Sequence, residues 1–142
     1  MQPLGILETA IYARDLEAAR RFYQDVFGLV LITRDPGRHV FFRCGTSVLL
    51  IFDPAATVVP SRAGGSVVPA HGTHGPGHFA LATREADLPA WRERLAEHGV
   101  DIEAEVVWPG GGRSLYVRDP AGNSVELASP VIWGLAEPGG EG

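Results

Sequence analysis

The stretch DLEAARRFYQDVFGL, Asp15–Leu29, carries the strongest helical pattern in the chain. Asp15 is placed to cap a first turn, and Gly28 is placed to end a helix in a left-handed conformation. The stretch therefore predicts an amphipathic helix over Asp15–Val26. The apolar residues at the spacing of one helix face are Leu16, Ala19, Phe22, Tyr23 and Val26.

The same organisation occurs again in the second half of the chain. Leu88, Trp91 and Leu95 have helical spacing, with Asp87 before them and Gly99 after them, and predict a helix over residues 88–97. In each half, one β-rich run precedes the helix and three follow it. The predicted strands are Ile6–Ala13, Leu29–Arg34, His39–Arg43 and Ser47–Phe52, and then Gly77–Thr83, Asp101–Val107, Ser114–Arg118 and Ser124–Ala128.

Matching residues indicate that the two halves are related by duplication. The matches are Ala10-Ile11 with Ala80-Leu81, Gly28 with Gly99, and Gly45–Val48 with Gly122–Val125. We predict a single α+β domain of two βαβββ modules. Its parts are module one at residues 4–54, a connecting loop at 55–76, module two at 77–130 and a disordered tail at 137–142. The loop has no sustained period, and loops of this length often serve as lids or crossovers.

Composition and charge exclude several classes of protein. The 142 residues carry a net charge of -5 with both signs interspersed, which gives no basic face for a nucleic acid backbone. Cys44 is the single cysteine, so an intramolecular disulfide is impossible and a reducing compartment is indicated. The first residues show no basic leader, and the apolar run Val48–Phe52 is too short to cross a bilayer. We expect a soluble, cytoplasmic protein without nucleic acid or membrane partners.

Two strings resemble those of the vicinal oxygen chelate superfamily: DLEAARRFYQDVFGL and YVRDPAGNSVEL (Tyr116–Leu127), together with the paired βαβββ order. This group contains the glyoxalases, bleomycin-resistance proteins and extradiol dioxygenases. The resemblance implies that each module curls its sheet into half of a cup, with metal ligands on the first and last strands. These places fall on Glu8, His78 and Glu126, and a fourth falls on Leu49, which cannot bind metal.

The residue types are consistent with a metal site at these positions. Taken singly, Glu8 is typical of an exposed strand residue and His78 of a hydrogen-bonded structural histidine. Glu126, however, interrupts an apolar stretch that should be buried, and a buried carboxylate requires a cation. One imidazole with two carboxylates suits Mn²⁺, Fe²⁺, Co²⁺, Ni²⁺ or Zn²⁺. Three protein ligands leave positions at which a substrate with two neighbouring oxygens can displace water.

Further polar and aromatic residues are candidates for catalysis or substrate binding. The predicted catalytic residues are Tyr116 and His39, and the predicted substrate-binding residues are Tyr12, Trp108, Arg113, Ser114 and Arg118. Residues 108–113 are expected to form a flexible, glycine-rich approach. The alternative interpretation is hairpin packing with a solvated Arg113, and for His39 an ordinary strand histidine. His71 and His74 lie in a glycine-rich loop and are expected to be solvated.

The resemblance leaves two functions open. The first is a metal-dependent glyoxalase- or dioxygenase-like enzyme, whether lyase, isomerase, dioxygenase or transferase, that stabilises oxyanionic intermediates of a small substrate. The second is a metal-free protein that sequesters a cationic drug, similar to the bleomycin-resistance proteins. Fosfomycin-resistance transferases and ring-cleaving dioxygenases usually have histidine at the place of Glu8. We also expect a homodimer, in which Glu8 of one subunit completes a site with His78 and Glu126 of the other.

Overall fold

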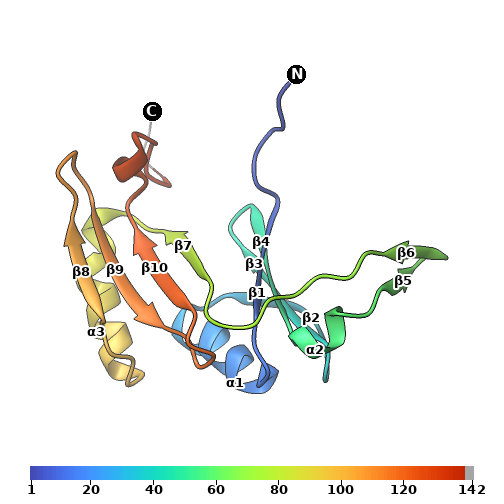
Figure 1. Ribbon diagram of the computed structural model, residues 1–142. Helices are drawn as coiled ribbons and strands as arrows, with labels where there is room; N and C mark the ends of the chain where they lie inside the picture. Colours follow the sequence, from blue (N-terminus) through green and yellow to red (C-terminus); the bar gives the residue numbers. More distant parts are fainter. Residues whose placement is uncertain (140–142) are drawn as a thin grey trace. The chain divides into compact units, whose positions relative to one another are not determined.

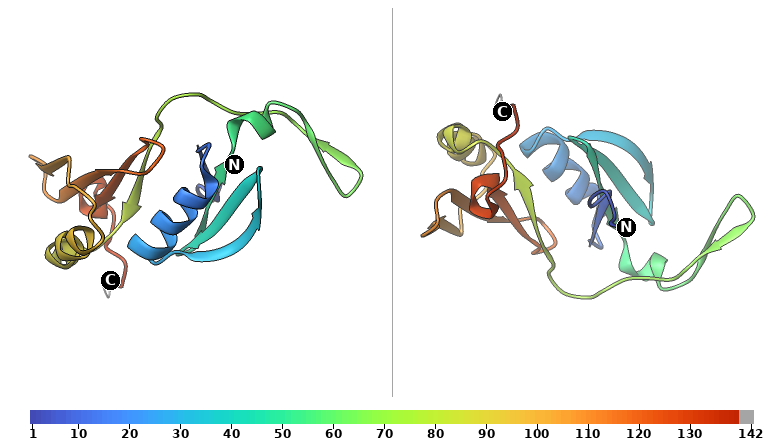
Figure 2. Two further views of the ribbon diagram at one scale, coloured as in Figure 1. Left: turned by 90° about the horizontal axis from the view of Figure 1, so that it is seen from below. Right: turned by 90° about the horizontal axis from the view of Figure 1, so that it is seen from above.

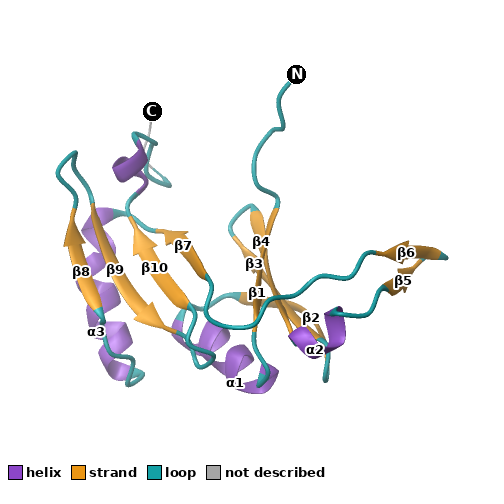
Figure 3. Ribbon diagram, viewed as in Figure 1, coloured by secondary structure: helices purple, strands orange, loops and turns teal. Residues whose placement is uncertain are grey.

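The structure is a computed structural model that describes residues 1–139. The chain forms two compact units: Met1–Gly77 with Pro120–Gly122, and His78–Asp119 with the residues from Asn123 onward. Figure 1 traces the elements along the chain, and Figure 3 separates strands from helices. Each unit contains a four-stranded sheet and a helix, and the order βαβββ occurs twice. The predicted α+β class and architecture are confirmed.

Module one, the sheet and helix of the first unit, has the strand order β1-β4-β3-β2. β1 runs parallel to β4, and the other neighbouring strands are antiparallel. The elements are β1 (Glu8–Tyr12), α1 (Leu16–Arg21), β2 (Val30–Asp35), β3 (His39–Cys44) and β4 (Ser47–Phe52). Ile11, Val40 and Ile51 are paired across the strands and buried on one face, which α1 covers. This face holds the core of module one.

The first helix has the predicted ends but two different geometries. The Asp15 carboxylate accepts a hydrogen bond from the N–H of Ala18 at 2.9 Å, and Gly28 follows the helix with φ +67°. From Phe22 to Val26 the α-helix gives way to a π-helical turn. The hydrophobic pattern predicted a helix here without distinguishing these geometries, because both bury the apolar side.

Module two repeats the order of module one as β7-β10-β9-β8, with β7 parallel to β10. The elements are β7 (His78–Ala82), α3 (Leu88–Glu97), β8 (Ala104–Val107), β9 (Arg113–Arg118) and β10 (Ser124–Ala128). Leu88 and Leu95 of α3 and Leu115, Val125 and Leu127 of the sheet are buried and form the core.

The ends of α3 agree with the sequence in one case and differ in the other. Gly99 follows the helix with φ +68°, as predicted. The prediction that Asp87 caps the first turn is wrong, because its side chain accepts no hydrogen bond from the helix. Asp87 instead forms an ion pair with Arg84, with 2.7 Å between Oδ2 and Nε.

Strand pairing aligns the two modules residue by residue. The paired residues are Glu8 with Val48 and Ala10 with Leu50 in module one, and His78 with Ser124 and Ala80 with Glu126 in module two. Leu50 therefore stands where Glu126 stands, and the sequence match that put Leu49 there is wrong by one residue. A slip of one residue moves a side chain to the other face, and Leu49 is buried on the helix side. We call the opposite side of each sheet, which carries Glu8 or Glu126, the site face.

The connection between the modules is more structured than its composition indicated. It contains the short helix α2 (Pro54–Thr57) and a hairpin of β5 (Ser61–Ala63) and β6 (Ser66–Val68). Both views in Figure 2 show this hairpin extending away from the sheet of module one. Sequence analysis missed β5 and β6 because three-residue strands are too short to show an alternating pattern.

The C-terminal segment has one firm attachment within the described residues. The Glu137 carboxylate accepts hydrogen bonds from the Glu85 N–H and the Ser129 hydroxyl, both at 2.8 Å. Glu137, the first residue of the predicted disordered tail, thus has specific contacts, and residues 140–142 of that tail lie outside the described residues. Between residues 1 and 139, no helix is long and apolar enough to cross a membrane.

Candidate metal-binding site

Glu126 is a buried carboxylate in the middle of β10. Its neighbours Val125 and Leu127 point into the core of module two, so alternation places Glu126 on the site face. Its side chain is only 8% exposed. Oε1 accepts a hydrogen bond from the Ser114 hydroxyl at 2.5 Å, and Oε2 lies 3.3 Å from His78 Nε2. A carboxylate buried to this degree needs such donors, or a cation, to offset its lost hydration.

His78 begins β7 and turns its ring towards Glu126. Its Nδ1 lies 3.1 Å from the Ser124 carbonyl oxygen and 3.2 Å from the Ser124 hydroxyl. Because a carbonyl oxygen only accepts, Nδ1 donates to Ser124, and Nε2 is the ring nitrogen that faces Glu126. This backbone contact on the far nitrogen is the arrangement that orients metal-binding histidines. The pairing of His78 with Ser124 depends on the register of two parallel strands, and sequence analysis did not find it.

Ser114 and Trp108 have partners inside module two. Ser114 lies on β9, is fully buried, and donates its hydroxyl proton to Glu126. The Trp108 indole N–H donates to the Ser114 hydroxyl oxygen at 2.9 Å. Both residues were predicted to bind substrate, and the structure connects both to the carboxylate.

Tyr116 lies directly opposite Glu126 in the β9–β10 pair. Its ring stacks with that of His78 at a centroid distance of 6.1 Å. Burial raises the pKa of the Tyr116 phenol, and the nearby charge of Glu126 raises it further. The phenol therefore keeps its proton at neutral pH and can donate a hydrogen bond.

Glu8 occupies the position in module one that His78 occupies in module two. It is exposed on the site face of β1, where Ala10 and Tyr12 are its alternate neighbours. Over residues 1–139 the structure forms no cluster of three or more His, Cys, Asp or Glu side chains that could hold a metal ion. What the structure brings together is His78, Glu126, Ser114 and Tyr116, all within the second unit.

The family model described as the Glyoxalase/Bleomycin resistance protein/Dioxygenase superfamily matches residues 5–127. The chain belongs to this superfamily. A crystal structure of lactoylglutathione lyase from Agrobacterium tumefaciens is 43% identical, with a TM-score of 0.88, and the match covers 95% of this chain and 100% of that one. A search of curated proteins finds no match.

More distant members of the glyoxalase superfamily share the fold. The fosfomycin resistance protein FosX from Listeria monocytogenes is 19% identical with a TM-score of 0.68, and the match covers 90% of this chain and 92% of that one. A variant of that protein, complexed with Mn(II) and 1S,2S-dihydroxypropylphosphonic acid, is 19% identical with a TM-score of 0.65 and coverage of 90% and 93%.

In this superfamily member the two arginines predicted to bind substrate are engaged in ion pairs. Arg113 Nε lies 3.3 Å from Glu85 Oε1, and its guanidinium also approaches Glu105. Arg118 Nε lies 2.6 Å from Glu103 Oε2. All these side chains are at least one-third exposed, so the pairs are solvent-screened and a substrate anion could displace them.

The remaining candidates lie in module one. The Tyr12 hydroxyl is 2.8 Å from His71 Nδ1, and the His71 ring packs against Phe52 at a centroid distance of 4.7 Å. His71 is exposed, as predicted, and it also has these specific contacts. His39 stacks on Phe41 at 4.1 Å, and burial lowers the pKa of its imidazole. The ring is therefore neutral at pH 7.

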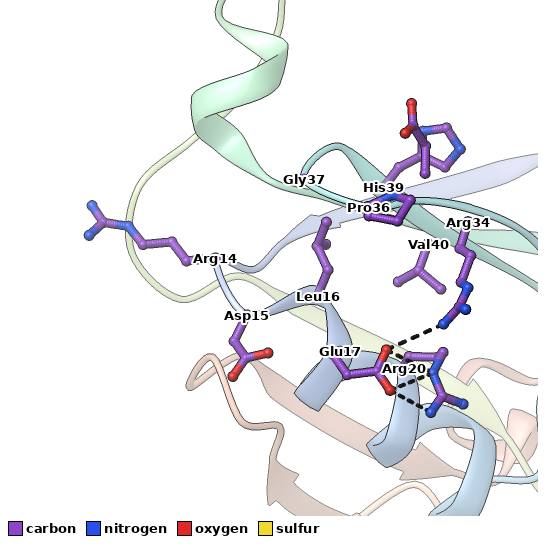
Figure 4. Close-up of a pocket in the computed structure, with 11 residues that line it drawn as sticks. Arg14, Asp15, Leu16, Glu17, Arg20, Arg34, Pro36, Gly37, His39 and Val40 are labelled. Carbon is purple, nitrogen blue, oxygen red and sulfur yellow. Dashed lines mark hydrogen bonds and ion pairs between the residues drawn. The ribbon is translucent and has the colours of Figure 1, made fainter.

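Two cavities lie in the first unit. The larger, of about 500 Å³, is bounded by the start of α1 and the β2–β3 turn (Figure 4). Glu17 binds the guanidinium groups of Arg20 and Arg34 there, as the dashed lines in Figure 4 show. Its lining includes Val40, from the helix-covered face, and His39, from the site face. The second, of about 380 Å³, includes Tyr12 and His74.

Proposed function

We propose that this protein is a divalent-metal-dependent lyase of the glyoxalase type, acting on a small molecule with two neighbouring oxygens. The observation that carries the proposal is the buried carboxylate of Glu126 with its Oε2 3.3 Å from His78 Nε2. The 43% identity to a lactoylglutathione lyase favours a lyase over the dioxygenase and transferase alternatives. Lactoylglutathione is a thioester of a 2-hydroxy acid, and its carbonyl and hydroxyl oxygens are neighbours.

The donor atoms of the site fit a divalent metal of borderline-to-hard character. Glu8, His78 and Glu126 would hold it, and Mn²⁺, Fe²⁺, Co²⁺, Ni²⁺ and Zn²⁺ all suit one imidazole and two carboxylates. A bound metal would supply Lewis acidity to the substrate oxygens. Glu126 Oε2 and His78 Nε2 face each other at 3.3 Å, and a cation bound by both atoms would offset the charge of the buried carboxylate.

The protein's own side chains have separable roles in this proposal. Ser114 holds one oxygen of Glu126, which leaves the other oxygen directed at His78. Tyr116 keeps its phenol proton and donates a hydrogen bond to a substrate oxygen as negative charge develops there. Arg118, on the site face at the end of β9, would exchange its present carboxylate partner for an anionic group of the substrate. Arg113 lies on the helix side of β9, as the buried Leu115 does.

The metal-free, drug-sequestering alternative is not favoured. Such a protein needs a flat apolar cleft, and it has no need of a buried glutamate held by a serine and facing a histidine. The relative with 43% identity is described as a lyase. We further propose a homodimer in the reducing cytoplasm, where the single thiol of Cys44 would stay free.

Metal analysis of protein purified without a metal-affinity tag tests the proposal. We expect about one divalent ion per chain after incubation with Mn²⁺, together with turnover of lactoylglutathione. His78→Ala should lose both. His74→Ala is the matched control, because His74 is an exposed loop histidine and should retain both. Wild-type protein without bound metal, or metal retained by His78→Ala, would contradict the proposal.

A further inference from the structure

Trp108 and Ser114 form a chain of hydrogen bonds that ends on Glu126. The Trp108 indole N–H donates to Ser114 Oγ at 2.9 Å, and Ser114 Oγ donates to Glu126 Oε1 at 2.5 Å. The direction of this chain is fixed by its first member. An indole N–H can only donate, so the Ser114 oxygen accepts from Trp108 and its single proton is left for Glu126.

We infer that Trp108 and Ser114 are positioning residues for Glu126, which is a deeper claim about the site that rests on the proposed function. Ser114 is 0% exposed, so its hydroxyl is closed to substrate in the folded chain. By holding Oε1, the chain leaves Oε2 as the oxygen that faces His78 and would bind the ion through one atom. Partners of this kind, one step removed from the ion, typically change metal affinity by about 10- to 100-fold.

Backbone hydrogen bonds fix the turn that carries Trp108. The backbone N–H of Trp108 donates to the Gly112 carbonyl, and the backbone N–H of Gly111 donates to the Trp108 carbonyl, both at 3.0 Å. Gly112 has φ +84°, and a Cβ at this position would lie 2.6 Å from the Ile132 side chain. Gly112 therefore permits a close approach to Ile132. The segment 108–113 is a hydrogen-bonded turn where the sequence predicted a flexible approach.

The experiment compares two Trp→Phe variants of the same module. Trp108→Phe removes the N–H that fixes the Ser114 hydroxyl. Trp91→Phe is the matched control, because Trp91 Nε1 donates to Thr83 Oγ1 at 3.0 Å and takes no part in the chain to Glu126. We expect Trp108→Phe to bind Mn²⁺ about tenfold more weakly, measured by chelator competition, and Trp91→Phe to bind it as wild type does.

A serine pair makes the test independent of the tryptophan. Ser114→Ala should weaken Mn²⁺ binding at least as much as Trp108→Phe, and Ser114→Thr, which keeps the hydroxyl, should restore it. In Ser114→Ala, turnover should lose kcat with little change in KM, because the Ser114 hydroxyl is fully buried. Wild-type Mn²⁺ affinity in Trp108→Phe or in Ser114→Ala would overturn the inference, as would equal losses in Trp108→Phe and Trp91→Phe.

Indole N–H resonances in the metal-free protein separate this inference from the proposed function. Glu126→Gln and Ser114→Ala should shift the Trp108 resonance and leave that of Trp91 in place. If wild-type protein bound no metal, the proposed function would fail, and a positioning role towards a metal would fail with it even if the resonance shifted. If wild type bound metal and the Trp108 resonance did not respond to Ser114→Ala, the inference alone would fail.

Discussion

The two modules share one strand pairing and have opposite chemistry on the site face. The register makes four pairs of positions equivalent: Glu126 with Leu50, Tyr116 with Phe41, Ser114 with His39, and His78 with Glu8. Module two carries a carboxylate with its donors, whereas module one carries an apolar and aromatic surface with a single imidazole. Only the first strands, with His78 and Glu8, carry a metal-binding type of residue in both modules.

This difference explains the state of His39. Its Nδ1 is buried and has no hydrogen-bond partner among residues 1–139. Ser114, its equivalent, has Glu126 two residues from its paired position, while His39 has Leu50 there. The two modules thus have the same strand pairing but not the same side-chain hydrogen bonds. Each such bond needs a partner side chain, and here only one module has it.

The largest effect is expected when two single variants, one at Glu8 and one at the equivalent His78, are refolded together. Glu8→Ala and His78→Ala are each expected to abolish metal binding. If the modules complete each other's sites across a homodimer, unfolding and refolding the two variants together should restore about a quarter of the wild-type sites, since half of the dimers are mixed and each has one intact site.

Sites completed within one chain would give no recovery, because every site would keep one lesion. Refolding each variant alone is the control and should give no metal binding. A chain that is monomeric at micromolar concentration by light scattering would contradict the dimer directly.

A smaller effect is expected from Tyr116→Phe, which gives module two the residue of module one at this position. The loss of one hydrogen bond of about 1 kcal/mol should lower turnover or ligand affinity roughly fivefold, with the melting temperature within a few degrees of wild type. Tyr23→Phe, in the buried core of module one, is the control and should leave turnover unchanged. A large loss of stability in Tyr116→Phe with unchanged turnover would assign the phenol to packing.

The smallest effect concerns the unsatisfied His39. Burial lowers the pKa of its imidazole in the folded state, so the unfolded chain binds a proton more readily. The associated stability is present above the ordinary pKa of 6.5 and is lost as the pH falls towards the lower folded pKa. His39→Gln should therefore lose less melting temperature than wild type between about pH 7.5 and pH 5. An identical pH dependence in both proteins would show that His39 does not contribute.

Sequence reasoning recovered the fold because its signals were local and occurred twice. The glycines that end both helices, Gly28 and Gly99, and the alternating strands follow from backbone geometry alone. For the candidate site, the sequence could predict residue types only. Two hydrogen bonds depend on which strands pair and in which register. They join Glu126 Oε1 to Ser114 and His78 Nδ1 to Ser124. The sequence match aligned the turns at Gly45 and Gly122, and this put Leu49 where the structure has Leu50. Register is set by strand pairing, so an alignment of turns can be wrong by one residue.

The turn that joins β5 and β6 is exposed and open to change. Gly64 and Gly65 at its tip have φ +55° and +82°, and a side chain added at either would meet no atom within 4 Å. The strands that bear Glu8, His78 and Glu126 lie outside this segment, so its length does not enter their register. Insertions accumulate at exposed tips of this kind. Changes in the length or side chains of this hairpin can therefore alter the surface around it without altering the strand register at Glu8, His78 and Glu126.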